Sequence, residues 1–242
     1  MEAIKKAGKF QFKQFSIAQD QCTMKVGTDG VLLGAWADVQ NAERILDIGA
    51  GTGVIAIMLG QRTEKALVHA VEIDAKAAEQ AALNCENAPW SDRLQIFQSS
   101  IQDFSKQSQE TYDLIVSNPP FFSGGTFSDN QDRNDVRHTV KLPHGDLLIA
   151  VRRLLAKQGK FCVVLPLIEG MRFKEFAAEY SLFCTKVTRV KAKAEKPVER
   201  LLLQFELENK PEVKDELVIQ YEGRNNWTEE YIELTKAFYL KM

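Results

Sequence analysis

The chain has 242 residues, of which 45% are hydrophobic and 26% are charged, as in ordinary globular proteins. This composition excludes a collagen-like repeat and a disordered chain, and the formal net charge of -2 argues against a non-specific polybasic binder. No apolar stretch reaches the ~18 uncharged residues that a membrane span needs. The N-terminal residues 1–15 lack an apolar signal core, so we expect a cytoplasmic protein.

Short apolar runs alternate along the chain with segments of helical length. The runs that predict strands are 44–48, 67–71, 94–97, 112–116 and 161–165. The segments that predict helices are 54–59, 75–87 and 147–155. Strands that alternate with helices in this way indicate a parallel sheet with helices on both of its faces.

The last third of the chain departs from this alternation. A predicted helix over 173–180 precedes two predicted strands, 185–190 and 201–207, which are joined by a polar loop and favour an antiparallel hairpin. A short strand over 217–221 and a closing helix over 228–240 are predicted to follow. A sheet that ends in such a hairpin is mixed rather than wholly parallel.

These elements predict an α/β fold: a Rossmann-like, seven-stranded mixed sheet with helices on both faces and a C-terminal antiparallel hairpin. The sequence shows no internal repeat and no linker. We therefore expect a single domain over 1–242, in which an N-terminal extension over 1–40 leads into a core over 41–242.

The cysteines and histidines give no metal-binding pattern. They are widely scattered and include no C-x-x-C pair: Cys22, Cys85, Cys162, Cys184, His69, His138 and His144. We predict no metal site, with thiols that are reduced and buried or idle.

A glycine-rich turn follows the first predicted strand. Residues 47–53 read Asp-Ile-Gly-Ala-Gly-Thr-Gly, and the next predicted strand ends at Glu72. Glycines let the backbone turn sharply and approach a ligand, and a carboxylate about 20 residues on is placed to bind ribose hydroxyls. This pattern predicts a nucleoside-containing cofactor at the carboxyl edge of the sheet.

The spacing of the turn favours S-adenosylmethionine over a dinucleotide. The turn is G-x-G-x-G rather than G-x-G-x-x-G, and Val54 stands where the dinucleotide fingerprint has its third small residue. Asp47, two residues before the first glycine, suits a cationic ligand and would repel a pyrophosphate. An NAD site, or a glycine turn that binds no ligand, remains the alternative.

A second motif follows the strand predicted over 112–116, where the chain reads Ser117-Asn-Pro-Pro-Phe-Phe122. The prolines stiffen the backbone, Asn118 adds an amide oxygen, and an aromatic ring follows at once. Hydrogen-bond acceptors beside a stacking surface suit methyl transfer to a planar amino group such as that of adenine. The alternative is a rigid turn packed by two phenylalanines.

With these motifs the sequence resembles class I S-adenosylmethionine-dependent methyltransferases that carry an N-P-P-[FY] active site. It resembles more closely the bacterial family that methylates the exocyclic amino nitrogen of adenine 37 in valine tRNA. The resemblance spans nearly the whole chain and includes Phe10–Phe15, Met24–Trp36, Leu46–Gly53, Asn118–Phe121 and Leu234–Met242.

The resemblance assigns roles to individual residues. The cofactor-binding residues that it implies are Thr28, Asp29, Asp47, Gly49, Gly51, Gly53, Glu72, Ile73, Ser100, Ile101 and Asn118. The catalytic residues that it implies are Asn118, Pro119, Pro120 and Phe121. Ser100 is a departure, because the family pattern commonly has an aspartate there, and Asp103 is a candidate to replace it.

A tRNA partner requires local positive charge. Two basic clusters offer it, one over 1–15 with interleaved phenylalanines and one over 184–200 on the predicted hairpin. We predict that both clusters contact phosphates and that the anticodon stem-loop is the part of the tRNA that binds. We also expect a monomeric enzyme and a polar lid over 123–143 that covers the target base. A solvated charged face is the alternative.

The same N-P-P-F chemistry would also suit a protein glutamine, a DNA adenine or an rRNA guanine, since each presents an N–H2 group. From other classes, an NAD-linked oxidoreductase and a catalytically inactive RNA-binding module remain as alternatives.

Overall fold

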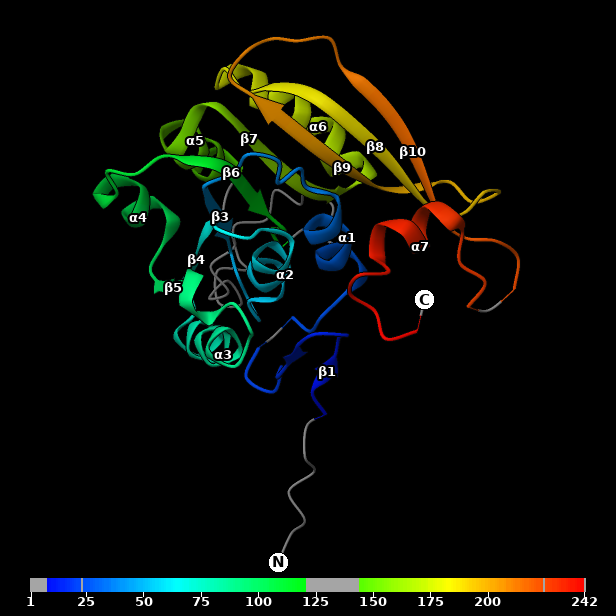
Figure 1. Cartoon of the computed structure of the whole chain (residues 1–242). Coiled ribbons are helices and arrows are strands. Elements are labelled where there is room, and N and C mark those ends of the chain that lie inside the picture. The colour runs from blue at the N-terminus through cyan, green and yellow to red at the C-terminus, as the bar shows by residue number, and fades with distance from the viewer. Residues whose placement is uncertain (1–7, 23, 121–143, 224, 242) are drawn as a thin grey trace, which may run out of the picture.

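The computed structural model describes residues 8–22, 24–120, 144–223 and 225–241. Across these residues the chain folds around one eight-stranded sheet, in the order β10-β8-β9-β7-β6-β3-β4-β5 (Figure 1). Its strands are β3 (Arg44–Ile48), β4 (Leu67–Glu72), β5 (Leu94–Gln98), β6 (Tyr112–Ser117), β7 (Leu155–Pro166), β8 (Phe183–Lys193), β9 (Val198–Glu206) and β10 (Val213–Gln220). A separate two-stranded sheet joins β1 (Phe10–Gln11) to β2 (Ser16–Ile17).

Helices cover both faces of the main sheet, as Figure 1 shows. They are α1 (Thr28–Trp36), α2 (Val54–Arg62), α3 (Ala75–Glu86), α4 (Ile101–Gln107), α5 (His144–Leu154), α6 (Leu167–Glu179) and α7 (Glu229–Thr235), with a 3-10 turn η1 (Ser91–Arg93). One apolar core lies under α1, α2 and α7, and a second lies under α5 and α6. The predicted α/β class, mixed sheet and C-terminal hairpin are confirmed.

The predicted number of strands was wrong, because the main sheet has eight strands rather than seven. β10 pairs in parallel with β8 at the edge of the sheet, and its second half, 217–220, matches the short strand predicted over 217–221. Its first half, Val213–Glu216, is exposed and polar, so it lacks the apolar alternation that marks a half-buried strand. Leu217 and Ile219 in its second half are buried in the core and α7 packs against the strand, whereas the exposed first half joins the sheet through backbone pairing with β8.

The predicted closing helix was too long. Thr228 does cap it, since the Thr228 hydroxyl accepts a hydrogen bond from Tyr231 N at 3.2 Å, but α7 ends at Thr235. Beyond it the chain turns so that Phe238 becomes buried and its carbonyl accepts a bond from Lys13 N at 2.8 Å. Tertiary pairing with the N-terminal segment therefore ends the helix.

The N-terminal segment contributes to the core. Phe12 and Phe15 are buried and their rings stack 4.5 Å apart. Helix α1 packs on α2, and its residues from Gly30 to Ala35 are buried. The aromatic residues that we predicted to interleave with lysines on an RNA-binding surface thus serve the core, which corrects that part of the prediction.

The parallel strands bring both sequence motifs to one edge of the sheet. β3 and β6 are neighbours, and Ile48 pairs with Ser117 as the last residues in register. The Ser117 hydroxyl also donates a 2.9 Å hydrogen bond to the carbonyl of Ile48. The glycine turn and the Asn-Pro-Pro turn therefore begin side by side. Among the described residues no helix is both long and apolar enough to cross a membrane.

Candidate active site

The glycine turn between β3 and α2 has the backbone geometry that only glycine adopts easily. Gly49, Gly51 and Gly53 have φ angles of +76°, +53° and +78°. A Cβ added at Gly49 or Gly51 would meet no atom within 4 Å, so both face open space, whereas one at Gly53 would lie 3.3 Å from Cβ of Ala81. Gly49 and Gly51 thus leave room for a ligand, and Gly53 allows α2 to begin against α3.

Asp47 lies at the end of β3, beneath this turn, and is fully buried. One carboxylate oxygen accepts a hydrogen bond from Ala56 N at 3.1 Å. The other oxygen is buried and has no partner among the described residues. Burial, with a smaller contribution from the charge of Glu72, raises the pKa of the Asp47 carboxyl to about 7. A buried carboxylate with a free oxygen is suited to a cationic group.

Glu72 ends β4 beside the turn. Its two carboxylate oxygens accept hydrogen bonds from Gly51 N at 2.8 Å and from Asp74 N at 3.0 Å. Each oxygen retains a lone pair, so the carboxylate can also accept bonds from hydroxyl groups. The next residue, Ile73, exposes 48% of its surface, which is high for a large apolar side chain. Together they offer a polar contact next to an apolar surface.

Asn118 leads the Asn-Pro-Pro turn after β6. Its amide oxygen is buried and has no hydrogen-bond partner among the described residues. Its amide nitrogen lies 3.8 Å from the position that a Cβ would take on Gly30 of α1. Pro119 is buried and Pro120 is exposed, while Phe121 falls outside the described residues. The structure therefore presents an unsatisfied acceptor beside the glycine turn.

Ser100 follows β5 as the N-cap of α4. Its hydroxyl accepts a bond from Asp103 N at 3.1 Å and donates one to the Asp103 carboxylate at 2.8 Å. Both residues are thus engaged in capping the helix. Ile101 is buried behind them. A cofactor contact by Ser100, Ile101 or Asp103 stays a prediction.

Thr28 and Asp29 begin α1. Thr28 is exposed, whereas Asp29 forms an ion pair with Arg200 of β9, its Oδ1 lying 2.8 Å from Nη1. Burial raises the pKa of Asp29, Arg200 opposes the rise, and Glu199 adds to it. The residue after Asp29 is Gly30, which faces the Asn118 amide. Arg200 was predicted only as part of a basic cluster.

Two buried amides on α3 belong to the site and were missed in the sequence. The Asn84 amide donates to the carbonyls of Ala18 and Thr52, at 2.8 and 2.9 Å, and its oxygen accepts from Ala18 N. Gln80, four residues earlier, accepts a bond from Gln21 N. The sequence did contain a signal for them, because two amide side chains spaced i, i+4 on the apolar face of an alanine-rich helix indicate buried, hydrogen-bonded groups.

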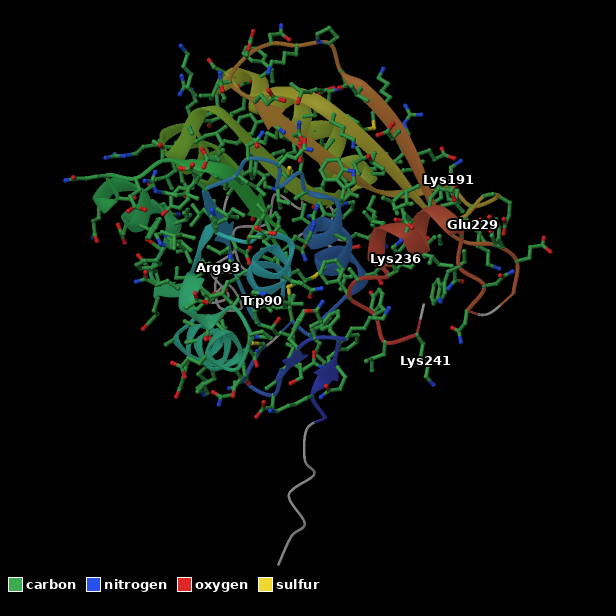
Figure 2. All side chains as sticks on the ribbon, viewed as in Figure 1. Trp90, Arg93, Lys191, Glu229, Lys236 and Lys241 are labelled. Carbon is green, nitrogen blue, oxygen red and sulfur yellow. The ribbon has the colours of Figure 1, made fainter. Side chains whose placement is uncertain are left out.

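Half of the six cations in the predicted basic cluster over 184–200 are paired with acids. Lys186 pairs with Asp215, and Lys191 with Glu216, at 3.4 and 3.0 Å. Figure 2 shows Lys191 near the end of β8. The parallel pairing of β8 with β10, which places acids opposite these lysines, could not be read from the sequence. Within this cluster, whose residues the structure describes, Arg189, Lys193 and Lys196 form no ion pair.

The structure describes two of the four lysines in the first predicted cluster, and Lys9 is exposed. Lys5 and Lys6 lie outside the described residues, and Lys13 donates a 2.6 Å hydrogen bond to the carbonyl of Lys236. The lid predicted over 123–143 also lies outside the described residues. Within the described ranges, no group of three or more His, Cys, Asp or Glu side chains is arranged to hold a metal ion.

Comparisons with known proteins agree with this geometry. A family described as "Methyltransferase small domain" matches residues 26–166. Proteins named tRNA1(Val) (adenine(37)-N6)-methyltransferase are 46% identical in Flavobacterium johnsoniae, over 96% of this chain and 100% of theirs, and 46% identical in Haemophilus influenzae 86-028NP, over 96% and 98%.

Solved structures show the same fold. A predicted O-methyltransferase from Agrobacterium tumefaciens, protein Atu636, matches with a TM-score of 0.67 at 18% identity, over 87% of this chain and 96% of that one. A glycopeptide N-methyltransferase, MtfA, complexed with S-adenosylhomocysteine matches with a TM-score of 0.54 at 12% identity, over 76% and 90%.

Proposed function

Since the chain belongs to the family of tRNA1(Val) (adenine(37)-N6)-methyltransferases, we propose that it transfers a methyl group from S-adenosylmethionine to N6 of adenine 37 in a valine tRNA. The observation that carries this proposal is the buried amide oxygen of Asn118, which has no partner among the described residues and lies beside the glycine turn at the ends of two adjacent strands.

The residues around the turn fit S-adenosylmethionine. Asp47 has a buried oxygen without a partner, which suits the ammonium of the methionine part, and the open space beside Gly49 and Gly51 admits that part to the backbone. Glu72 would accept the ribose hydroxyls, and Ile73 would lie against the adenine. When bound, the cofactor supplies a methyl group on a sulfonium, with a neutral thioether as the leaving group.

Asn118 would act on the target amino group. An adenine amino nitrogen is a weak nucleophile because its lone pair is delocalised into the ring. An amide oxygen that accepts one of its N–H bonds draws the nitrogen toward tetrahedral geometry and offsets the positive charge that develops on it. Pro119 and Pro120 keep the backbone after Asn118 rigid, so that the acceptor is in place before the reaction.

The target amino group keeps its protons until the methyl group has been transferred. The amide of Asn118 holds the amino group without removing a proton from it, so the step needs no strong base. The surplus proton can leave to solvent after transfer. Phe121, the residue that we expect to stack on the extruded base, lies outside the described residues and its role stays a prediction.

The tRNA would approach the carboxyl edge of the sheet. Lys193, which ends β8, and Lys196, on the turn to β9, lie at this edge and are available for phosphate contacts. We propose the anticodon stem-loop as the bound part and a monomer as the active form. A tRNA substrate is also consistent with the cytoplasmic location that the sequence predicts.

Transfer of tritium from labelled S-adenosylmethionine tests the proposal. Purified enzyme is incubated separately with total tRNA, total protein and DNA from cells that lack it, and labelled tRNA is digested for nucleoside mass spectrometry. We expect label in tRNA alone, as N6-methyladenosine. Label in protein or DNA, with none in tRNA, would show that the acceptor is wrong.

A further inference from the structure

Arg200 connects the C-terminal hairpin to the helix that borders Asn118. Its guanidinium nitrogen Nη1 lies 2.8 Å from Asp29 of α1, and Nη2 lies 3.0 Å from Glu199. Both side chains of the Asp29–Arg200 pair are about four-fifths buried, at 22% and 21% exposed. A charge pair with this much burial is screened less by solvent than a surface pair.

The first turn of α1 has weak local support. Its N-cap, Gly27, provides no side-chain hydrogen bond, and the first helical bond, from Val31 N to the carbonyl of Gly27, is long at 3.3 Å. Gly30 and Gly34 lower the helix propensity further. This turn therefore depends on contacts from elsewhere in the fold.

The last turn of α1 is held by other elements. The indole nitrogen of Trp36 donates a 2.9 Å hydrogen bond to Thr188 of β8, and Lys160 of β7 pairs with Asp38, just beyond the helix. Arg200 is the cation that reaches the opposite end, at Asp29. The two ends of α1 are thus anchored separately.

The position of Arg200 is fixed by the sheet. Arg200 pairs with Pro166 of β7 and with Val190 of β8, so its backbone is held on both sides. β7 is also the neighbour of β6, where Ser117 pairs with Val163. Arg200 therefore lies near the sheet edge that carries Asn118, two strands away.

We propose that Arg200 is a positioning residue for methyl transfer. Through its ion pair with Asp29 it fixes the first turn of α1. Gly30 in that turn lies beside the Asn118 amide and limits the position that this amide can take. The proposal rests on the proposed function for its kinetic consequence. It assigns Arg200 a role inside the enzyme, distinct from a contact with tRNA phosphate.

Hydrogen exchange and kinetics on three variants test the proposal. Arg200→Ala removes the anchor, and Arg200→Lys retains the charge with a single-point donor. Lys160→Ala is the matched control, because it breaks the ion pair at the other end of α1. For each protein, deuterium uptake by the peptide over 27–36, the affinity for S-adenosylhomocysteine, and kcat and KM for tRNA are measured.

For Arg200→Ala we expect first-turn exchange, which is exchange of the Val31 amide bonded to the Gly27 carbonyl of that turn, to be about tenfold faster or more. We expect kcat to fall about 10- to 100-fold, since a displacement of ~1 Å can cost on the order of 100-fold, while KM for tRNA changes less than about twofold. Arg200→Lys should recover part of kcat. Lys160→Ala should keep both the first-turn exchange and kcat within about twofold of the wild type.

Two results would overturn the proposal. Unchanged first-turn exchange in Arg200→Ala would show that Arg200 does not anchor α1. A raised KM for tRNA with unchanged kcat would assign Arg200 to phosphate binding instead. If the wild type transfers no methyl group to tRNA, the proposed function is wrong, and the exchange measurement still decides whether Arg200 anchors the helix.

Discussion

Replacing Asp47 with Asn separates the charge of this side chain from its shape. The asparagine oxygen can still accept the bond from Ala56 N, but the negative charge is gone. Burial raises the pKa of Asp47 from 3.8 to about 7. At about 1.4 kcal/mol per pH unit, this difference corresponds to about 4 kcal/mol between the folded and unfolded chains.

The sign of this effect follows from proton linkage. Because the pKa is higher in the folded chain, the folded chain binds the proton more tightly, and the ionised carboxylate destabilises it. The destabilisation is absent below the unfolded pKa of 3.8 and complete above the folded pKa of about 7. The free energy of unfolding of the wild type should therefore fall, relative to Asp47→Asn, by up to about 4 kcal/mol as pH rises through this window.

Urea unfolding of the cofactor-free proteins between about pH 5 and pH 8 covers the upper part of this window, over which the difference should change by about 3 kcal/mol. Any constant cost of the asparagine amide cancels, because the test is the change of the difference with pH. The same variant should bind S-adenosylhomocysteine about 30-fold more weakly or worse at pH 8, as removing one partner of a buried charge pair costs ~2–5 kcal/mol. Parallel pH dependences together with unchanged affinity would refute the assignment of Asp47.

Three further variants test other parts of the site. Asn118→Ala should lower kcat about 100- to 1,000-fold. The affinity of this variant for S-adenosylhomocysteine, measured by calorimetry, should stay within about threefold of the wild type, and retained turnover would contradict the role of Asn118. Asn84→Asp loses the donors to Ala18 and Thr52 and should lower the free energy of unfolding by about 2–3 kcal/mol in urea, whereas the exposed Asn209→Asp should change it by less than about 0.5. Gly53→Ala should cost more stability in urea than Gly49→Ala, since both have positive φ but only Gly53 faces Ala81 at 3.3 Å; equal losses would contradict the close packing of α2 on α3.

The sequence was sufficient to predict the fold class and the meeting of the two motifs. Runs such as 44–48 and 112–116 are buried on both faces, so their apolar character marks them as central strands. The carboxyl ends of parallel strands share one edge, which is why the positions of Gly49 and Asn118 could be predicted without coordinates.

Other features depend on pairing between distant segments and leave little trace in the sequence. β10 is half exposed and charged, so its pairing with β8, and the neutralisation of Lys186 and Lys191 that follows, could not be predicted. The Asp29–Arg200 pair joins residues 171 positions apart. The burial of Phe12 depends on the C-terminal segment, where Tyr239 stacks against it.

A crystal structure of the enzyme with S-adenosylhomocysteine tests the central claim most directly. We expect the ligand's ammonium within hydrogen-bond distance of the free oxygen of Asp47, its ribose on Glu72, and its sulfur facing the Asn118 amide across an open gap. A ligand bound at another edge of the sheet, or an Asn118 amide turned away from the sulfur, would contradict the claim that the two strand ends form one methyl-transfer site.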